Sequence, residues 1–341
     1  MEDIWGKTDS SLRRKNIPIS IVFELTRRCN LSCIHCYNTK DDVQLTMRQI
    51  ENIALGLRRA GCLFLTLTGG EIFVRDDCLE IVSLLRHMGF DIKIITNGTM
   101  ITNIEARRLK ELSVSEIGVS LYGVSSSVHD RITQVKGSFE KTLSAIKALK
   151  KEGIAVHIKC TIMKENFAEY RGIIELARNL EVTYIIDPVI SPKDDGSNSV
   201  LRHRLDFEDL KSFYWEEFDS INTEDSSQRG ANFCDAGFNF GAISAEGNVY
   251  PCIQLPLKVG NVFENDFKDI WDNSPLLNDI RRRVNSGESE CTNCNLYHYC
   301  SRCPGLSYLE NGSLFGPSES ACLTARIYKE FRDRKRYEVK N

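Results

Sequence analysis

Thirteen cysteines occur in this chain of 341 residues, and ten of them fall into groups. The first group reads Cys29-Asn-Leu-Ser-Cys33-Ile-His-Cys36-Tyr37. Three thiolates within eight residues can surround one face of a [4Fe–4S] cluster and leave its fourth iron open to a small molecule. A zinc site and ordinary core packing are the alternatives, although zinc sites usually add a second ligand pair far along the chain.

The other grouped cysteines lie late in the chain and are numerous enough for two further sites. They are Cys234, Cys252, Cys291, Cys294, Cys300, Cys303 and Cys322. An odd cysteine total without an export signal argues against a disulfide framework, and clustered thiols in a reducing compartment usually bind metal or carry out redox chemistry. We therefore expect a cytoplasmic protein. For the late cysteines, a zinc-ribbon-like lobe is the alternative to iron–sulfur clusters.

Composition excludes several classes of function. The net charge is −3 and the isoelectric point is near 6.1, so no general affinity for nucleic acid is expected. No apolar run reaches the roughly 18 residues that a membrane-spanning helix needs. The length suits two or three domains.

Strand-like and helix-like segments alternate between residues 20 and 190. The expected strands cover residues 21–25, 63–68, 92–96, 117–121, 156–162 and 184–188. Six β-then-α units predict a parallel sheet with right-handed crossovers, either an incomplete barrel or a doubly wound sheet. In both folds the ligand site lies at the carboxyl ends of the strands, where every distinctive motif before residue 130 falls.

These strand-end motifs give the chain a family resemblance. They are Thr68-Gly69-Gly70-Glu71, Thr96-Asn97-Gly98 and Val119-Ser120-Leu121. Together with the C-x3-C-x2-C group they resemble the radical S-adenosylmethionine (radical SAM) superfamily over residues 20–190. The resemblance implies an α/β fold with a partial (β/α)6 TIM-like barrel. It also implies that the open iron binds S-adenosylmethionine, whose reductive cleavage yields a 5′-deoxyadenosyl radical.

The resemblance also implies cofactor-binding roles for single residues. Gly69, Gly70 and Glu71 match the motif that holds the amino group of the methionine moiety. A glycine pair admits a close backbone approach, and a carboxylate can pair with an ammonium. Asn97 and Ser120 match segments that line the cofactor and touch its ribose.

Two further cofactor contacts are expected near these motifs. His35, just before the third cysteine, would pack on the adenine, and a solvent-facing loop histidine is the alternative. Arg131 would reach the cofactor carboxylate, and a surface arginine is the alternative. Where the family often has aspartate two residues after the serine, this chain has Tyr122.

The late cysteines resemble the SPASM extension of radical SAM enzymes, a domain of short strands and loops with auxiliary iron–sulfur clusters. The interleaved pattern of that family implies one cluster on Cys234, Cys252 and Cys303. It implies a second on Cys291, Cys294, Cys300 and Cys322. Gln228, Asp235 or an open iron would complete the first.

Five segments follow from these matches. They are an N-terminal segment 1–19, a barrel core 20–190, a connector with the sixth helix 191–230, a SPASM domain 231–325 and a helical tail 326–341.

The implied activity is hydrogen-atom abstraction from an unactivated C–H bond, followed by oxidation of the substrate radical. The resemblance favours an oxidoreductase-type maturase that crosslinks, epimerises or oxidises a residue of a ribosomally made peptide. The alternatives are the same chemistry on a sugar, tetrapyrrole or cofactor precursor, and an iron–sulfur electron-transfer protein without turnover. We expect an external one-electron reductant such as flavodoxin or ferredoxin. Because about 19 residues precede the first strand, we expect any leader peptide to be bound by a separate leader-binding protein or by another surface of this chain.

Two residues are candidates for contact with the substrate. Cys160 lies in the fifth expected strand, where alternate residues face the barrel interior, and a thiol there could donate a hydrogen atom. Asp187 ends the sixth strand and could act as a base or polar anchor. Core packing for Cys160 and a loop cap before Pro188 for Asp187 are the alternatives.

Overall fold

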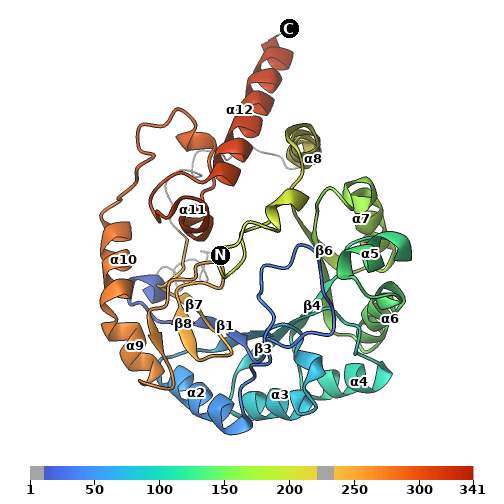
Figure 1. Ribbon diagram of the computed structural model, residues 1–341, viewed down its shortest axis with the longest axis vertical. Helices are drawn as coiled ribbons and strands as arrows, with labels where there is room; N and C mark the ends of the chain where they lie inside the picture. Colours follow the sequence, from blue (N-terminus) through green and yellow to red (C-terminus); the bar gives the residue numbers. More distant parts are fainter. Residues whose placement is uncertain (1–10, 221–233, 341) are drawn as a thin grey trace, which may run out of the picture.

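The computed structural model describes residues 11–220 and 234–340, and its centre is one curved sheet (Figure 1). The strands are β1 (Ser20–Glu24), β2 (Phe64–Thr68), β3 (Asp91–Thr96), β4 (Glu116–Ser120), β5 (Ala155–Thr161), β6 (Thr183–Asp187), β7 (Phe240–Ile243), β8 (Asn248–Tyr250) and β9 (Gly260–Asn261). Their order in the sheet is β6-β5-β4-β3-β2-β1-β7-β8-β9.

Helices follow the strands in the order that the sequence pattern indicates. The α-helices are α2 (Met47–Arg59), α3 (Cys78–His87), α4 (Asn103–Glu111), α5 (Ser126–Thr133), α6 (Ser138–Lys151), α7 (Tyr170–Asn179), α8 (Phe207–Ser220), α9 (Phe267–Asn273), α10 (Pro275–Asn285), α11 (Pro304–Asn311) and α12 (Glu319–Lys340). The short 3-10 turns are η1 (Ile72–Val74), η2 (Phe167–Glu169), η3 (Leu201–His203) and η4 (Tyr297–Tyr299). Capping boxes at Thr46 and Thr102 set the starts of α2 and α4.

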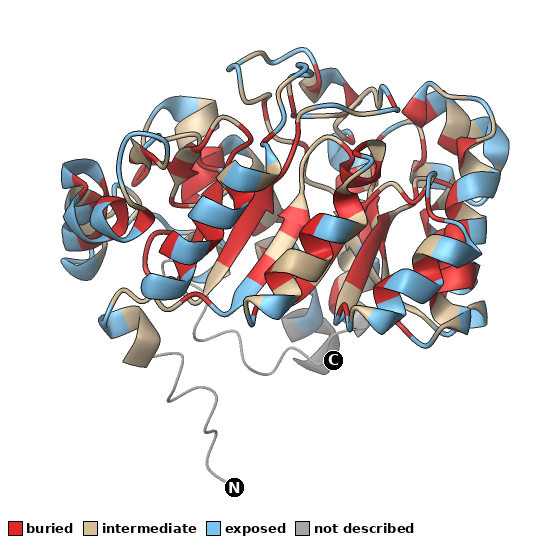
Figure 2. Ribbon diagram, turned by 90° about the horizontal axis from the view of Figure 1, so that it is seen from below, coloured by how far each residue is buried: buried red, intermediate tan, exposed pale blue. Residues whose placement is uncertain are grey.

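Strands β1 to β6 are all parallel and form the partial barrel that the family resemblance implied. The strand pattern alone had left a doubly wound sheet open. Helices α2, α3, α4, α6 and α7 line the outer side of the arc in Figure 1. The strand residues that face these helices are buried, and Figure 2 shows them as a continuous core between strands and helices. The opposite set of strand residues, which faces the barrel interior, is largely half-exposed.

The late segment joins the barrel through its sheet. Strand β7 pairs in parallel with β1, from Ser20 opposite Phe240 to Phe23 opposite Ile243. Strands β8 and β9 then continue the sheet in antiparallel fashion. The cysteine-rich part therefore extends the barrel sheet on its β1 side.

Two sequence expectations differ from the structure in detail. Helix α12 starts at Glu319, so the expected boundary at residues 325 and 326 falls inside one helix. Helix α5 was not expected, because Ser126–Thr133 has short polar residues in its first turn and only two turns of apolar spacing.

Candidate functional site

Loop 26–45 leaves the carboxyl end of β1 and carries the first three cysteines. Its two ends are held together by an antiparallel bridge between Thr26 and Gln44. The Arg27 amide donates to the Val43 carbonyl at 2.8 Å. The loop is therefore closed at its base by backbone hydrogen bonds.

The middle of this loop rests on the end of α5. The amides of Ser32 and Ile34 donate to the carbonyls of Thr133 and Ile132, each at 3.0 Å. These bonds use carbonyls that the helix end leaves unpaired. Helix α5 thus fixes the segment that lies between the first and third cysteines.

The three thiols of this loop are free, half-buried and within electrostatic reach of one another. Burial, together with the neighbouring thiols of Cys36 and Cys29, raises the pKa of Cys33 to about 12. Burial also raises the pKa of Cys29 and of Cys36. A bound cluster would remove this repulsion, because its iron takes up thiolates and releases their protons. The donor set fits a [4Fe–4S] cluster with one open iron.

A site for a single metal ion requires its ligands to lie closer together than the ligands of an iron–sulfur cluster do. Within the described residues, no three His, Cys, Asp or Glu side chains converge closely enough for a single ion. Each cysteine ligand of an iron–sulfur cluster binds a different iron, so such ligands stand further apart.

Gly69 and Gly70 bring the end of β2 against the base of the cysteine loop. A Cβ on Gly69, whose φ is +151°, would lie 2.2 Å from the Thr26 carbonyl oxygen, and a Cβ on Gly70 would lie 2.2 Å from the Arg28 carbonyl oxygen. The Gly70 and Glu71 amides donate to these two carbonyls at 2.8 Å. The close approach that glycine permits is therefore an approach to the cysteine loop.

The Glu71 carboxylate is buried and fully engaged by protein donors. It accepts hydrogen bonds from the Phe73 amide at 3.0 Å, the Thr96 hydroxyl at 2.8 and 2.9 Å, and the Asn97 amide at 2.7 Å. Burial raises the pKa of this carboxyl, and the hydrogen bonds act against that rise. Glu71 therefore ties the end of β2 to the end of β3. Its contact with the cofactor stays a prediction.

Asn97 continues this connection to the cysteine loop. Its side-chain NH2 group donates to the side-chain oxygen of Asn30 at 2.9 Å, and its own side-chain oxygen accepts from the Thr99 backbone amide at 2.9 Å. Asn30 in turn donates to the Thr99 hydroxyl at 2.8 Å. These bonds hold the Asn97 side chain next to Asn30, the residue that follows Cys29. Its contact with the cofactor stays a prediction.

Ser120 and His35 meet at Tyr122. The Tyr122 phenol hydrogen-bonds Ser120, and the His35 ring lies edge-on to the Tyr122 ring with centroids 4.7 Å apart. Burial, with His203 in support, lowers the pKa of His35 to about 4, so its ring is neutral. The buried Nδ1 of His35 has no hydrogen-bond partner among the described residues, which leaves it available to a bound group.

Arg131 lies on α5 and points to a different loop. Its side chain is exposed, and its guanidinium donates to the Glu165 carbonyl at 3.0 Å. Arg131 therefore links α5 to the loop after β5. Its contact with the carboxylate of S-adenosylmethionine stays a prediction.

Cys160 faces the helix layer and not the barrel interior. The side chain is 2% exposed, belongs to the same core cluster as Ile158, and accepts a hydrogen bond from the Asn166 amide at 3.7 Å. The hydrogen-donor role needs a thiol on the other face of β5, so the expectation that Cys160 faces the substrate is corrected. The interior positions beside it are Lys159 and Thr161.

Asp187 is the last residue of β6 and shares a register position with Thr161 of β5. Its side chain is exposed, although surrounding protein raises the pKa of the carboxyl while Lys159 acts to lower it. The carboxylate accepts the Val189 amide at 2.8 Å, the turn-capping contact that was the alternative interpretation. Lys159 projects from the neighbouring strand, and its stem lies 2.8 Å from where a Cβ on Gly118 would be.

The late cysteines separate into two groups by electrostatic contact. Burial raises the pKa of Cys252 to about 11, with Cys234 and Cys303 acting in the same direction. Burial raises the pKa of Cys300 to about 11, and there the thiols that add to it are Cys322, Cys291 and Cys294. These are the two sets that the resemblance implies, and their role as ligands stays a prediction.

The fourth ligand of the first of these groups is not identified. Asp235 forms an ion pair with Arg13, and Gln228 lies outside the described residues. The Cys303 thiol lies 3.9 Å from the Gln254 side-chain oxygen.

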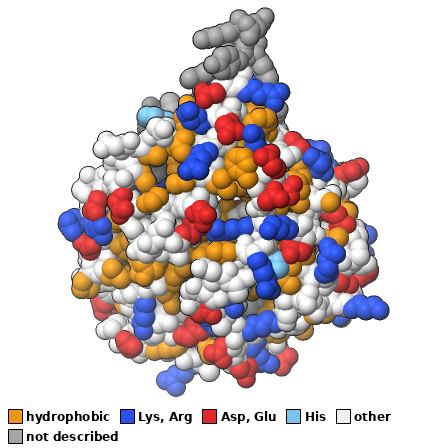
Figure 3. Space-filling model, turned by 45° about the horizontal axis from the view of Figure 1, so that its top comes forward, with side chains coloured by type: hydrophobic (Ala, Val, Ile, Leu, Met, Phe, Trp, Pro, Cys, Tyr) orange, Lys and Arg blue, Asp and Glu red, His pale blue; other side chains and the backbone are white. Residues whose placement is uncertain are grey.

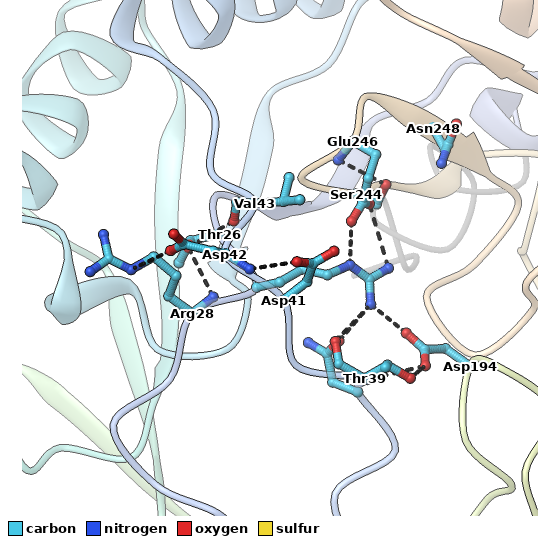
Figure 4. A network of polar contacts seen from close by, with 12 residues as sticks. Thr26, Arg28, Thr39, Asp41, Asp42, Val43, Asp194, Ser244, Glu246 and Asn248 are labelled. Carbon is cyan, nitrogen blue, oxygen red and sulfur yellow. Dashed lines mark hydrogen bonds and ion pairs between the residues drawn. The ribbon is translucent and has the colours of Figure 1, made fainter.

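Arg27 connects the cysteine loop to two distant segments, and motif reasoning missed it. Figure 4 shows its partners Asp194 and Glu246, which come from different elements, with Thr39 beside Asp194. Its guanidinium donates to Asp194 at 2.5 Å, to Glu246 and, at 2.7 Å, to Asn38. Asp194 lies in the connector after β6, and Glu246 lies in the turn between β7 and β8. The Asp194 carboxylate also accepts the Thr39 amide at 3.1 Å. A contact over 219 residues leaves no local pattern in the sequence, so no signal could have found it.

The carboxyl of Glu24 lies beside this network. The residue is 3% exposed, and its pKa is raised to about 7, mainly by burial. The charge of Arg27 lowers this pKa, whereas the carboxylates of Glu246 and Asp194 raise it. On the face of the molecule that Figure 3 shows, acidic and basic side chains are interspersed with hydrophobic ones.

Comparisons with known proteins agree with this geometry. The family model "Radical SAM superfamily" matches residues 23–177, and the model "Iron-sulfur cluster-binding domain" (SPASM) matches residues 234–304. The AdoMet-dependent heme synthase of Methanosarcina barkeri is 26% identical over 329 residues, which cover 87% of this chain and 94% of that protein. The antilisterial bacteriocin subtilosin biosynthesis protein AlbA of Bacillus subtilis is 30% identical over 316 residues, 87% of this chain and 69% of that protein.

A solved structure shows the same fold. Streptococcus suis SuiB bound to its precursor peptide SuiA superposes with a TM-score of 0.70 at 18% identity, covering 93% of this chain and 79% of that chain. In the described part of this chain, no helix has both the length and the apolar character needed to cross a membrane.

Proposed function

We propose that this chain, which belongs to the radical SAM superfamily and carries a SPASM domain, is a maturase that modifies a peptide substrate. The observation that carries the proposal is the loop of three half-buried free thiols, closed at its base and held at the carboxyl ends of β1, β2 and β3. The named activity of the relative AlbA, bacteriocin biosynthesis, supports a peptide as the substrate.

The barrel part binds a [4Fe–4S] cluster and S-adenosylmethionine, and the SPASM part binds auxiliary iron–sulfur clusters. When bound, the first cluster and the cofactor supply a radical that abstracts a hydrogen atom. In the proposal, Cys29, Cys33 and Cys36 hold that cluster. Gly69, Gly70 and the Glu71 network keep the loop that carries them in place, since they bond its base.

The interior wall of β5 and β6 would meet the substrate. Lys159 and Asp187 supply one basic and one acidic side chain there, in line with the polar anchor expected at Asp187. Neither has an ion-pair partner within the described residues at contact distance. A peptide that enters the barrel can therefore bind to both without displacing an existing salt bridge.

The partners and setting complete the proposal. All thirteen cysteines are free, which suits a reducing cytoplasm. The chain would take electrons from a flavodoxin or ferredoxin and could receive its substrate from a separate leader-binding protein.

The test uses anaerobically reconstituted protein with S-adenosylmethionine, a reductant and short peptides encoded near its gene. Formation of 5′-deoxyadenosine together with a mass change in one peptide is expected. Cys29→Ala should abolish both, whereas the control Cys62→Ala, which removes a buried core thiol, should retain both. Cofactor cleavage without any peptide product would contradict the peptide assignment.

A small-molecule substrate is the second candidate. The observation that favours it is the likeness to an AdoMet-dependent heme synthase over 94% of that protein's length. The same assay with a tetrapyrrole in place of peptides separates the two candidates.

A further inference from the structure

Strand β6 forms an open edge of the barrel sheet. It is the last strand on its side and pairs only with β5 within the described residues. None of its five residues is fully buried, and Ile185 is 49% exposed. An edge of this kind offers unpaired backbone groups to another extended chain.

The register identifies which backbone groups are unpaired. The Asp187 carbonyl accepts the Ile162 amide of the β5 side at 2.9 Å, so Asp187 directs its backbone toward β5. Because backbone direction alternates along a parallel strand, Ile185 also faces β5, whereas Tyr184 and Ile186 face outward. Strand β6 pairs only with β5 among the described residues, and no turn or loop hydrogen bond reaches the backbone of either outward residue. Within the described part of the chain, two amides and two carbonyls at this edge are therefore without a partner.

A small cavity continues the edge beyond the end of β6. It has a volume of about 180 Å³ and is lined by Val189, Leu205, Leu210, Tyr214 and Leu323, with Arg204 at its polar side. These residues come from the segment after β6, from α8 and from α12. Helices α8 and α12 lie side by side there, and Figure 1 shows them on the open side of the arc. The cavity can hold a single side chain.

We propose that β6 is the docking strand for the peptide substrate, which pairs with it in extended form and places one apolar side chain in this cavity. The inference rests on the proposed function and specifies how the substrate is held. An extended backbone is the occupant because only alternating carbonyls and amides complement the free groups of Tyr184 and Ile186. Sequence-tolerant pairing of this kind suits an enzyme that must hold a peptide beside the residue it modifies.

The pairing also directs the substrate toward the cofactor side of the barrel. Ser120 of β4 pairs with Lys159 of β5, and Lys159 pairs with Ile185 of β6. A residue of the bound strand opposite Ile185 extends this interior row, about 4.8 Å beyond β6. Its side chain therefore enters the interior at the level of Ser120, while its neighbours along the peptide point away.

The test compares two substitutions at one position. Ile186→Pro removes the outward amide and leaves the ladder to β5 intact, since proline is tolerated on an edge strand where its missing amide faces outward. Ile186→Ala shortens the same side chain and keeps the amide, so it is the matched control. The probe is a pool of fluorescein-labelled nonapeptides of random sequence, with binding to the reconstituted enzyme measured by fluorescence polarisation. Deuterium exchange at single-amide resolution is the second readout.

We expect Ile186→Pro to weaken binding of the pool about 5- to 10-fold relative to Ile186→Ala, the effect of one lost hydrogen bond. Bound peptide should slow exchange at the amides of Tyr184 and Ile186, while Ile185 and Asp187 exchange slowly with or without it. Equal binding by the two variants, or no binding by the wild type, would overturn the docking strand.

The outcomes keep this inference separate from the proposed function. If both variants modify a substrate peptide equally well, the docking strand is wrong and the maturase assignment stands. If no peptide is modified by the wild type although the pool protects Tyr184 and Ile186, the maturase assignment fails. Concentration-dependent dimerisation that Ile186→Pro abolishes would show that a second copy, and not a peptide, occupies the edge.

Discussion

Removing the Arg27 guanidinium should loosen the cysteine loop from the rest of the protein. The side chain is 15% exposed, whereas its partners Asp194 and Glu246 are 23% and 31% exposed. Arg27→Gln leaves these two carboxylates and the nearby Glu24 without their cation. Breaking a buried ion pair costs roughly 3–5 kcal/mol, and the partial exposure of both partners reduces this to about 2–3 kcal/mol.

The assay is urea unfolding of the anaerobically reconstituted protein, arranged as a double-mutant cycle. We expect Arg27→Gln to lower the free energy of unfolding by about 2–3 kcal/mol, and about 1 kcal/mol or more of coupling with Glu246→Gln. The adjacent Arg28 is the control, because its side chain is 48% exposed and its partner Asp42 is 91% exposed. Arg28→Gln removes the same charge beside the cysteines but should cost less than about 0.5 kcal/mol.

A functional readout follows from the position of Arg27 two residues before Cys29. Loss of the network should weaken S-adenosylmethionine binding, measured by calorimetry, because the loop can then sample other positions. Equal losses for Arg27→Gln and Arg28→Gln, or no coupling to Glu246, would refute the reasoning. In that case the loss of positive charge near the cysteines, and not the loss of the link between segments, would explain the lower stability.

Three further predictions follow from the site. Cys29→Ala should abolish cofactor cleavage, whereas Cys294→Ala should lower iron content and product yield while sparing some cleavage, as iron analysis and chromatography of 5′-deoxyadenosine would show. Glu71→Gln should cost about 1–3 kcal/mol in urea unfolding, because its amide group would face the Asn97 amide donor; weaker cofactor binding at unchanged stability would instead favour a direct contact. Glu24, with a folded pKa of about 7 raised from 4.5, binds its proton more tightly in the folded state. Stability should therefore fall between pH 4.5 and 7 by up to about 3 kcal/mol and stay low above, and Glu24→Gln should flatten that fall in pH-dependent unfolding.

Sequence reasoning predicted the parts of the site that depend on local order. The cysteine loop, the glycine pair and Asn97 each follow a strand of a parallel sheet, and parallel strands bring their carboxyl ends to one edge. The two groups of late cysteines also match the implied sets. These features need only the order of elements and the spacing within a motif.

The direction of single side chains was harder to predict. In β5, His157, Lys159 and Thr161 alternate with Val156, Ile158 and Cys160. The alternation shows that the two sets face opposite ways, but a thiol is compatible with either face. The structure turns the polar set to the interior, because the helices need the apolar set for their core. The hydrogen bonds of Glu71 were equally hard to predict, since those from Thr96 and Asn97 come from the end of β3, about 25 residues away.

The two edges of the barrel sheet differ: another strand continues the sheet next to β1, but none does so next to β6 among the described residues. This difference connects the fold to the proposed function. On the β1 side, β7 continues the sheet and Arg27 bonds Glu246 in the turn that follows β7, so the SPASM part closes the side on which the cysteine loop begins. On the β6 side, the described residues add no strand, and the inward wall carries Lys159 and Asp187, neither of which forms a salt bridge with a described residue. A substrate that must reach the carboxyl ends of the strands therefore has one side of the barrel on which backbone pairing, polar anchors and space occur together.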